Sequence, residues 1–287
     1  MNPGRSGPAV LVAEAKLTLS LRVTGVRPDG YHLLRSEMVT VDLADRLEVG
    51  EGTGLTVATE FGPAPGPTGG TGPALPGPVG TGPDNLVSRA LEAAGRTARV
   101  HLVKRIPPGA GLGGGSADAA AVLRWAGCTD PGVAAVLGAD VPFCVAGGRA
   151  LVEGIGEQVT PLPFVDRSFV LVLLPFGVAT AAVYRAWDDL ASDGVLGPTG
   201  PGPGTGPRAE VNDLEAPALV VEPRLAAWKR YLSDLTGQEP RLAGSGSTWF
   251  VEGTPAGLGL EGRGTLTLDD QPAGLVAVRT TRGAVPQ

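Results

Sequence analysis

The sequence predicts an α+β protein built as two lobes, because patterns typical of strands and of helices intermix in both halves of the chain. Residues 17–23 (LTLSLRV) are apolar at every second position, as in a strand with one buried face. Residues 116–126 (SADAAAVLRWA) are rich in alanine and predict a helix with Ser116 as its N-cap and Gly127 at its end. We expect residues 1–158 to form the N-terminal lobe and residues 159–287 the C-terminal lobe.

Two clusters rich in glycine and proline, residues 62–83 and 197–207, interrupt the predicted strands and helices. Glycine does not recur at every third position over a long stretch, which excludes collagen, so we expect flexible surface insertions. Further strands are expected at residues 46–49, 98–103, 169–174, 264–268 and 274–279, and further helices at residues 85–94, 181–190 and 225–235.

Composition limits the classes of partner. The 287 residues carry a formal net charge of −6, so a basic surface for nucleic acid is not expected. Two cysteines and two histidines do not suggest a disulfide framework or a zinc site, and we expect no metal held by protein ligands. The apolar run at residues 169–175 is too short to cross a membrane, and residues 1–8 lack the order of a signal peptide, so the expected compartment is the cytoplasm.

A glycine-rich loop, residues 107–116 (PPGAGLGGGS), lies between an expected strand and the alanine-rich helix. Glycine lets an anion approach the backbone, and a helix N-terminus offers unpaired N–H groups and partial positive charge. A Walker A loop is excluded because no lysine follows the last glycine. A dinucleotide-binding pattern fits residues 109–114 by letters alone, and a flexible loop is the other alternative. The position between a regular strand and a regular helix favours a phosphate cradle.

Two charged residues are candidates for chemistry. Lys16 precedes an apolar strand, and Asp140 lies within the apolar segment of residues 137–143 (LGADVPF). A charge that is buried has to be paired or functional. The ordinary alternatives are an exposed lysine at a strand end and an aspartate that caps a helix or turn.

Two further segments allow two interpretations each. Residues 27–32 (RPDGYH) end in Tyr31 and His32, which predict either a hairpin connection or a platform that stacks on a base and hydrogen-bonds it. Residues 242–250 (LAGSGSTWF) predict either a plain turn or a second wall of a phosphate pocket.

The order of these segments resembles one family of enzymes. The glycine loop is typical of the GHMP kinase superfamily, and the DGYH and GADVP segments are typical of its 4-diphosphocytidyl-2-C-methyl-D-erythritol kinases. The resemblance covers nearly the whole chain. The matching segments are residues 15–17 (AKL), 29–32 (DGYH), 84–86 (DNL), 104–107 (KRIP) with the loop that follows, 137–142 (LGADVP), 153–157 (EGIGE), 212–215 (NDLE) and 244–246 (GSG).

The resemblance implies a two-lobe GHMP kinase fold with the active site in the cleft between the lobes. It implies transfer of the ATP γ-phosphoryl group to the 2-hydroxyl of cytidylylated methylerythritol, in the non-mevalonate route to isoprenoid precursors. Asp140 would be the catalytic base, and Lys16 would orient the hydroxyl and hold Asp140 ionised. The residues implied for ATP are Asn85, Leu86, Lys104, Pro107, Gly109, Ala110, Gly111, Leu112, Gly113, Gly114, Gly115 and Ser116. The residues implied for the acceptor are Tyr31, His32, Ile155, Thr180 and Tyr184, with His32 at the edge of the cytosine and Tyr184 on its face.

The resemblance also implies Mg²⁺, which we expect to be carried by ATP because no acidic cluster suggests a metal cage in the protein. The expected partner is a small-molecule substrate, without nucleic acid or membrane, and the expected state is a monomer or homodimer. Thr18 stands where the family usually has asparagine. This difference leaves open a nucleotide-binding paralogue impaired in catalysis. A second alternative is another GHMP kinase for mevalonate, homoserine or a sugar, against which Tyr31 and His32 argue because such an acceptor carries no base.

Overall fold

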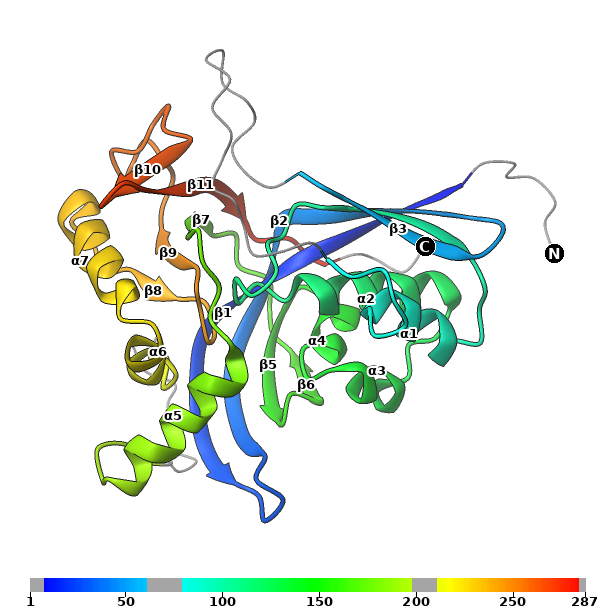
Figure 1. Ribbon diagram of the computed structural model, residues 1–287, viewed down its shortest axis with the longest axis horizontal. Helices are drawn as coiled ribbons and strands as arrows, with labels where there is room; N and C mark the ends of the chain where they lie inside the picture. The colour runs from blue at the N-terminus through cyan, green and yellow to red at the C-terminus, as the bar shows by residue number, and fades with distance from the viewer. Residues whose placement is uncertain (1–7, 61–78, 198–210, 284–287) are drawn as a thin grey trace.

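Two β-sheets form the framework of the chain, and the computed structural model describes residues 8–60, 79–197 and 211–283 (Figure 1). The first sheet has the strand order β3-β4-β2-β5-β6, with β1 paired along β2, and the second has the order β10-β11-β7-β9-β8. Neighbouring strands are antiparallel except for β3 and β4. The strands are β1 (Ala9–Val26), β2 (His32–Gly50), β3 (Gly54–Thr59), β4 (Arg99–Lys104), β5 (Arg149–Gly154), β6 (Gln158–Pro161), β7 (Ser168–Leu173), β8 (Arg241–Leu242), β9 (Trp249–Glu252), β10 (Thr265–Leu268) and β11 (Gln271–Arg279).

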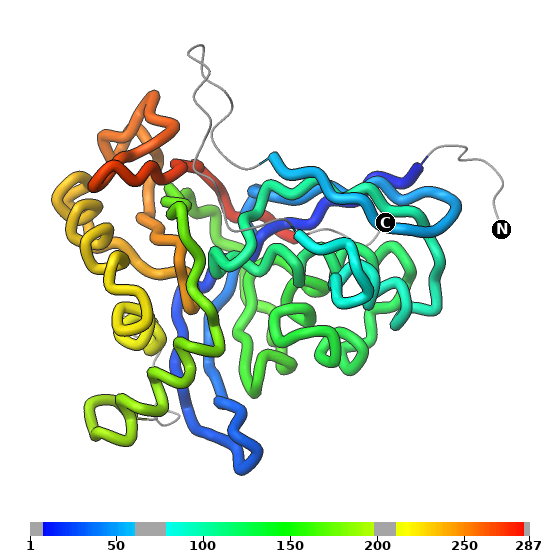
Figure 2. The backbone as a smooth tube through the Cα atoms, viewed as in Figure 1, coloured from blue at the N-terminus to red at the C-terminus, as the bar shows by residue number. Residues whose placement is uncertain are grey.

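The helices fall into two groups on opposite sides of the long β1–β2 pair (Figure 1). The first group packs on the first sheet and the second group on the second sheet, each through its own apolar core. The tube view follows β1 and β2 as one curved pair that runs past both groups (Figure 2). The first group is α1 (Leu86–Ala93), α2 (Gly114–Ala126), α3 (Pro131–Leu137) and α4 (Val141–Ala146), and the second is α5 (Thr180–Ser192), α6 (Glu215–Val221) and α7 (Arg224–Thr236).

A third apolar cluster lies where the two sheets meet. Ile106, Ala110 and Leu112, from the end of β4 and the glycine loop, pack there with Leu17 of β1 and Phe250 of β9. Each of these side chains is at most 5% exposed, so burial of apolar surface from both sheets holds this segment in place. The glycine loop therefore lies at the junction of the two halves of the molecule.

Local signals explain how the helices next to the site begin and end. Asn85 caps α1, since its Oδ1 accepts the N–H of Val87 at 2.8 Å. Gly127 ends α2 as predicted, with a φ of +72° that favours glycine. The predicted N-cap of α2 is wrong: the helix starts at Gly114, and Gly113 is its cap residue. The run of glycines lets the backbone enter the helix two residues before Ser116, which becomes the third residue of the helix.

The other predicted elements are all present, seven of them within three residues of their expected bounds. The strands expected at residues 17–23 and 46–49 are parts of much longer strands, because β1 and β2 stabilise each other along their length. The predicted lobe boundary falls at the start of β6, which pairs with β5 in the first sheet, and this division stays a prediction. The predicted insertions at residues 62–83 and 197–207 lie mostly outside the described residues. No helix in the described ranges is long and apolar enough to span a membrane.

Candidate active site

The glycine loop has a backbone that favours an anion. Gly109, Gly111 and Gly113 have φ angles of +70°, +76° and +66°, in the left-handed region that L side chains rarely adopt. α2 then starts at Gly114, and the N–H groups of its first turn have no acceptor within the helix. The partial positive charge of the helix N-terminus adds to these N–H groups. The loop leaves a mostly antiparallel sheet, unlike the parallel sheet that the dinucleotide-binding alternative requires.

The segment of residues 242–250 lies against the other side of this loop. The N–H of Thr248 donates to the carbonyl of Ala110 at 3.2 Å. A Cβ at Gly111 would lie 2.1 Å from the carbonyl oxygen of Ala243, so the two segments touch through their backbones. Gly244 and Ser245 line the same cavity as the loop. The segment is thus a wall of the cavity, and its predicted role in a phosphate pocket stays a prediction.

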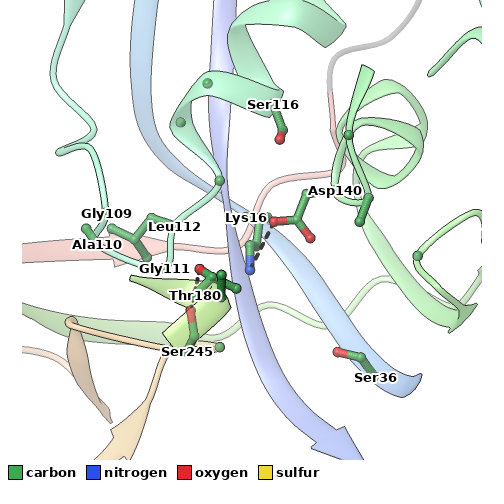
Figure 3. Close-up of a pocket in the computed structure, with 18 of the residues that line it drawn as sticks. Lys16, Ser36, Gly109, Ala110, Gly111, Leu112, Ser116, Asp140, Thr180 and Ser245 are labelled. Carbon is green, nitrogen blue, oxygen red and sulfur yellow. Dashed lines mark hydrogen bonds and ion pairs between the residues drawn. The ribbon is translucent and has the colours of Figure 1, made fainter. Parts of the chain in front are cut away.

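Lys16 and Asp140 meet beside the loop (Figure 3). The Lys16 ammonium lies 3.5 Å from Asp140 Oδ2 and donates to Thr18 Oγ1 at 3.1 Å. Lys16 is 5% exposed, so it is not the exposed strand-end lysine of the ordinary alternative. Asp140 occupies the N-cap position of α4 but its side chain makes no capping hydrogen bond, which leaves the carboxylate to pair with Lys16. Ser116 points from α2 toward this pair (Figure 3).

One cavity of about 1300 Å³ contains all of the predicted site residues. Its wall is formed by elements of both sheets and by helices of both groups. Typical pockets for one small ligand have volumes of roughly 300–1,000 Å³, so this one is large enough for two ligands. The predicted residues on its wall are Lys16, Tyr31, His32, Asn85, Leu86, Lys104, Pro107, Gly109, Ala110, Gly111, Leu112, Gly113, Gly114, Gly115, Ser116, Asp140, Ile155, Thr180 and Tyr184.

Aromatic residues gather at the tip of the β1–β2 hairpin and on α5. The ring centroids of His32 and Tyr184 are 4.7 Å apart, and His32 Nε2 lies 2.7 Å from Asp188 Oδ1. Tyr31 is 59% exposed, with the guanidinium carbon of Arg27 5.9 Å from the centroid of its ring. Burial, with a smaller contribution from Asp140, raises the pKa of the Tyr184 hydroxyl well above its usual value, so this ring stays neutral.

The polar side chains of three residues that were predicted to bind ligands interact with other groups of the protein. The Asn85 amide donates to the carbonyl of Gly80 at 2.7 Å while its oxygen caps α1. The Thr180 hydroxyl lies 2.9 Å from the Ser245 hydroxyl, which links α5 to the second wall of the cavity (Figure 3). The Lys104 ammonium pairs with the carboxylates of two aspartates and is buried. Their roles toward ligands stay predictions.

Several residues on the cavity wall were not predicted. Asp188 lies four residues after Tyr184, so its place on the same face of the predicted helix was available from the sequence. Asp118 is an acidic residue within an alanine run, the same signal that selected Asp140. Ser36 lies on β2, where its hydroxyl donates to the carbonyl of Ser20 at 2.7 Å, and nothing in the local sequence distinguishes it.

Comparisons with known proteins identify the family of the chain. Residues 85–148 match the family model described as GHMP kinases N terminal domain. A 4-diphosphocytidyl-2-C-methyl-D-erythritol kinase of Paracoccus denitrificans is 42% identical over 246 residues, which cover 83% of this chain and 84% of the relative. A kinase of the same name from Parvibaculum lavamentivorans is 39% identical over 276 residues, which cover 85% of this chain and 89% of the relative.

Solved structures support the same family. A crystal structure of 4-(cytidine 5'-diphospho)-2C-methyl-D-erythritol kinase superposes with a TM-score of 0.59 at 32% identity, covering 84% of this chain and 89% of that chain. Mevalonate kinase of Methanococcus jannaschii superposes with a TM-score of 0.56 at 12% identity, covering 96% of this chain and 99% of that chain, which supports the fold alone. The predicted α+β GHMP kinase fold is confirmed. The chain belongs to the 4-diphosphocytidyl-2-C-methyl-D-erythritol kinase family of the GHMP kinases.

Proposed function

We propose that the chain transfers the γ-phosphoryl group of ATP to the 2-hydroxyl of 4-(cytidine 5'-diphospho)-2-C-methyl-D-erythritol, a step in the non-mevalonate synthesis of isoprenoid precursors. Relatives with 36% to 42% identity over most of the chain carry the name of that kinase. The observation that carries the proposal is the buried Lys16 ammonium facing Asp140 beside the glycine loop, in a cavity with room for two nucleotide-bearing ligands.

The proposed reaction is an in-line displacement at phosphorus. The acceptor oxygen forms a bond to the γ-phosphorus, the bond from that phosphorus to the β–γ bridging oxygen breaks, and ADP leaves. Asp140, whose side chain is 33% exposed, accepts the proton of the acceptor hydroxyl. Lys16 offsets negative charge on the group in transfer, and the N–H groups of the loop and of the first turn of α2 hold the phosphates.

We propose that Mg²⁺ enters with ATP. In the ranges that the structure describes, no group of three or more histidine, cysteine, aspartate or glutamate side chains is arranged to hold a metal ion. Mg²⁺ commonly binds through substrate phosphates with few protein ligands, which fits this set of residues. When bound, the ion neutralises charge on the β- and γ-phosphate oxygens.

We propose that the cytosine of the acceptor stacks between Tyr31 and Tyr184, with His32 at its edge. The rings of His32 and Tyr184 are already in contact, so a base cannot insert between these two. Tyr31 is 59% exposed, and Tyr31 and Tyr184 of α5 both line the cavity. An aromatic platform of this kind fits an acceptor that carries a nucleobase, which mevalonate, homoserine and simple sugars lack.

The test is an ATP-to-ADP assay with the cytidylylated and the uncytidylylated methylerythritol as acceptors. We expect rapid ADP formation and a phosphorylated product with the cytidylylated compound alone. Equal rates with the two compounds would overturn the proposed substrate and favour another GHMP kinase activity. ATP binding without ADP formation on either compound, or on mevalonate and homoserine, would instead favour the catalytically impaired paralogue.

A further inference from the structure

A buried cluster of charges lies next to the glycine loop, and the reaction proposed above assigns no step to it. Lys104, the last residue of β4, pairs with Asp45 of β2 and, at 2.7 Å, with Asp118 of α2. All three side chains are at most 4% exposed. Charges at this depth require close partners, because water does not solvate them. The cluster therefore connects three elements that surround the loop.

Asp45 also binds the backbone that enters the loop. Its Oδ1 accepts the N–H of Arg105 at 2.5 Å and the N–H of Ile106 at 2.8 Å, while its Oδ2 accepts from Lys104. The pairing of β2 with β4 starts next to it, at Arg46 and Val103. Asp45 thus accepts the N–H groups of the two residues that follow β4, where the chain leaves the sheet. One carboxylate with three donors sets where the loop begins.

Lys104 connects this start of the loop to its end. Its second carboxylate, Asp118, is the fifth residue of α2, the helix that leaves the loop. A Cβ at Gly114 would lie 3.1 Å from the Lys104 ammonium and 2.9 Å from Ile106 Cγ2, so the helix start rests directly on these two side chains. The entry strand and the exit helix are therefore held by the same ammonium group.

The charge balance of the cluster agrees with this arrangement. Burial disfavours the charged form of Lys104, but Asp118 and Asp45 outweigh burial and raise the pKa of its ammonium above the usual value. Burial raises the pKa of Asp118, whose Oδ1 has no hydrogen-bond partner among the described residues. Asp45 differs from Asp118 because it has three donors, and a neutral amide in its place would offer one acceptor atom to all of them.

We propose that Asp45 is a positioning residue for ATP: through Lys104 and the N–H groups of Arg105 and Ile106, it holds the glycine loop in the conformation that receives the phosphates. Asp45 is at most 1% exposed and is not part of the cavity wall, so it acts through the loop and not by contact with the nucleotide. The proposal rests on the use of ATP proposed above and adds a residue that neither the local sequence nor the cavity wall identifies.

The test is calorimetric titration with a non-hydrolysable ATP analogue and Mg²⁺, without the acceptor. We expect Asp45→Asn to bind the analogue about tenfold more weakly or worse, because the loop N–H groups that receive the phosphates would no longer be held in place. The KM of the acceptor in the steady-state assay is expected to stay unchanged. A merely structural role would lower the fraction of binding-competent protein, seen as reduced stoichiometry, and leave the affinity unchanged, which would overturn the proposal.

The matched control is Asp42→Asn on the same strand. Asp42 also accepts a backbone N–H, from Arg279 at 2.9 Å, but it is exposed and its donor is the last residue of β11, not the segment that enters the loop. We expect this variant to bind the analogue as the wild type does. Equal affinities for Asp45→Asn and Asp42→Asn would overturn the proposal.

A second variant covers the case in which Asp45→Asn does not fold. Asp45→Glu keeps a negative charge for Lys104 but moves the carboxylate by one methylene, away from its place opposite the N–H groups of Arg105 and Ile106. We expect weaker binding of the analogue, and affinity equal to that of the wild type would overturn the proposal. Absence of binding to the wild type would overturn the proposed use of ATP, and this inference with it.

Discussion

The ammonium of Lys16 lies 3.5 Å from Oδ2 of Asp140, although the two residues come from the middle of β1 and from the start of α4. Lys16 is buried while a third of the Asp140 side chain faces the cavity. A buried cation that holds a partly exposed carboxylate suits a base that must meet an incoming hydroxyl. The first prediction concerns this carboxylate.

Asp140→Asn is expected to lower kcat by about 100-fold or more, because general base catalysis contributes roughly 10²–10⁴-fold. Binding of an ATP analogue is expected to persist, since the glycine loop is unchanged. The control is Asp130→Asn at the N-cap of α3, where asparagine caps as well as aspartate and turnover should stay at the wild-type level. Turnover that survives Asp140→Asn would exclude this residue as the base.

Thr18→Val is expected to reduce kcat about tenfold with little change in the KM of ATP. The hydroxyl of Thr18 accepts from the Lys16 ammonium at 3.1 Å, and valine removes that acceptor at equal volume. Thr18→Ser keeps the hydroxyl and should retain most of the activity. Steady-state kinetics on both variants checks this, and equal kcat values for valine and serine would show that Thr18 does not orient Lys16.

Gly111→Ala is expected to raise the KM of ATP at least about tenfold, because its Cβ would lie 2.1 Å from the backbone carbonyl of Ala243 and the loop must shift. Gly127→Ala is the matched control: its φ of +72° is close to the +76° of Gly111, but no described residue outside its own backbone neighbours lies within 4 Å of the added Cβ. The control should lower the free energy of unfolding by about 1 kcal/mol from backbone strain, without a change in KM. Steady-state kinetics measures the KM of ATP for both variants, and chemical denaturation measures their free energy of unfolding. A similar KM of ATP for Gly111→Ala and Gly127→Ala would contradict the prediction.

Asp188→Asn is expected to raise the KM of the acceptor several-fold and leave the KM of ATP unchanged. The Asp188 carboxylate lies 2.7 Å from Nε2 of His32 and holds the imidazole beside Tyr184. Asp189→Asn, one residue further on α5 and exposed, changes the charge equally on another face and should have no effect. If Asp188→Asn changed the KM of ATP and left the KM of the acceptor unchanged, the cytosine of the acceptor would not bind next to His32 and Tyr184.

Glu14→Gln is expected to stabilise the protein at neutral pH. Burial raises the pKa of the Glu14 carboxyl above its usual value, and the negative charge of Asp42 adds to this rise. A hydrogen bond with Thr281 and the positive charge of Arg124 lower the pKa, but by less than burial raises it. Because the folded state holds this proton more tightly than the unfolded state, the carboxyl lowers the free energy of unfolding as pH rises from the unfolded pKa through the folded one. The amide does not titrate, so its advantage should be full at pH 7 and shrink toward about pH 4.

Chemical denaturation of wild type and Glu14→Gln across this pH range measures the difference directly. Glu51→Gln, in the exposed turn between β2 and β3, changes the net charge by the same amount and serves as the control. A stabilisation that does not depend on pH, or that is equal in both variants, would contradict the argument from burial.

The sequence by itself determined the features that depend on neighbouring residues. The glycines at positions 109, 111 and 113 allow the left-handed backbone of the loop, Asn85 caps α1, and Gly127 ends α2. The spacing of apolar residues along the sequence predicted the positions of most helices and strands, because each element buries one face. Ser116 shows the limit of local signals: serine is a good N-cap, but the preceding glycines allowed the helix to start earlier.

The tertiary structure decided which residues meet. Lys16 and Asp140 each had an ordinary alternative role in the sequence, and their contact, set by the packing of β1 against α2 and α4, removes those alternatives. Asp45 lies in an unremarkable strand segment, and its three donors are the last residue of β4 and the two residues that follow it. The physical reason is that hydrogen bonds and ion pairs between distant segments depend on strand register and helix packing, which no local pattern of residues encodes.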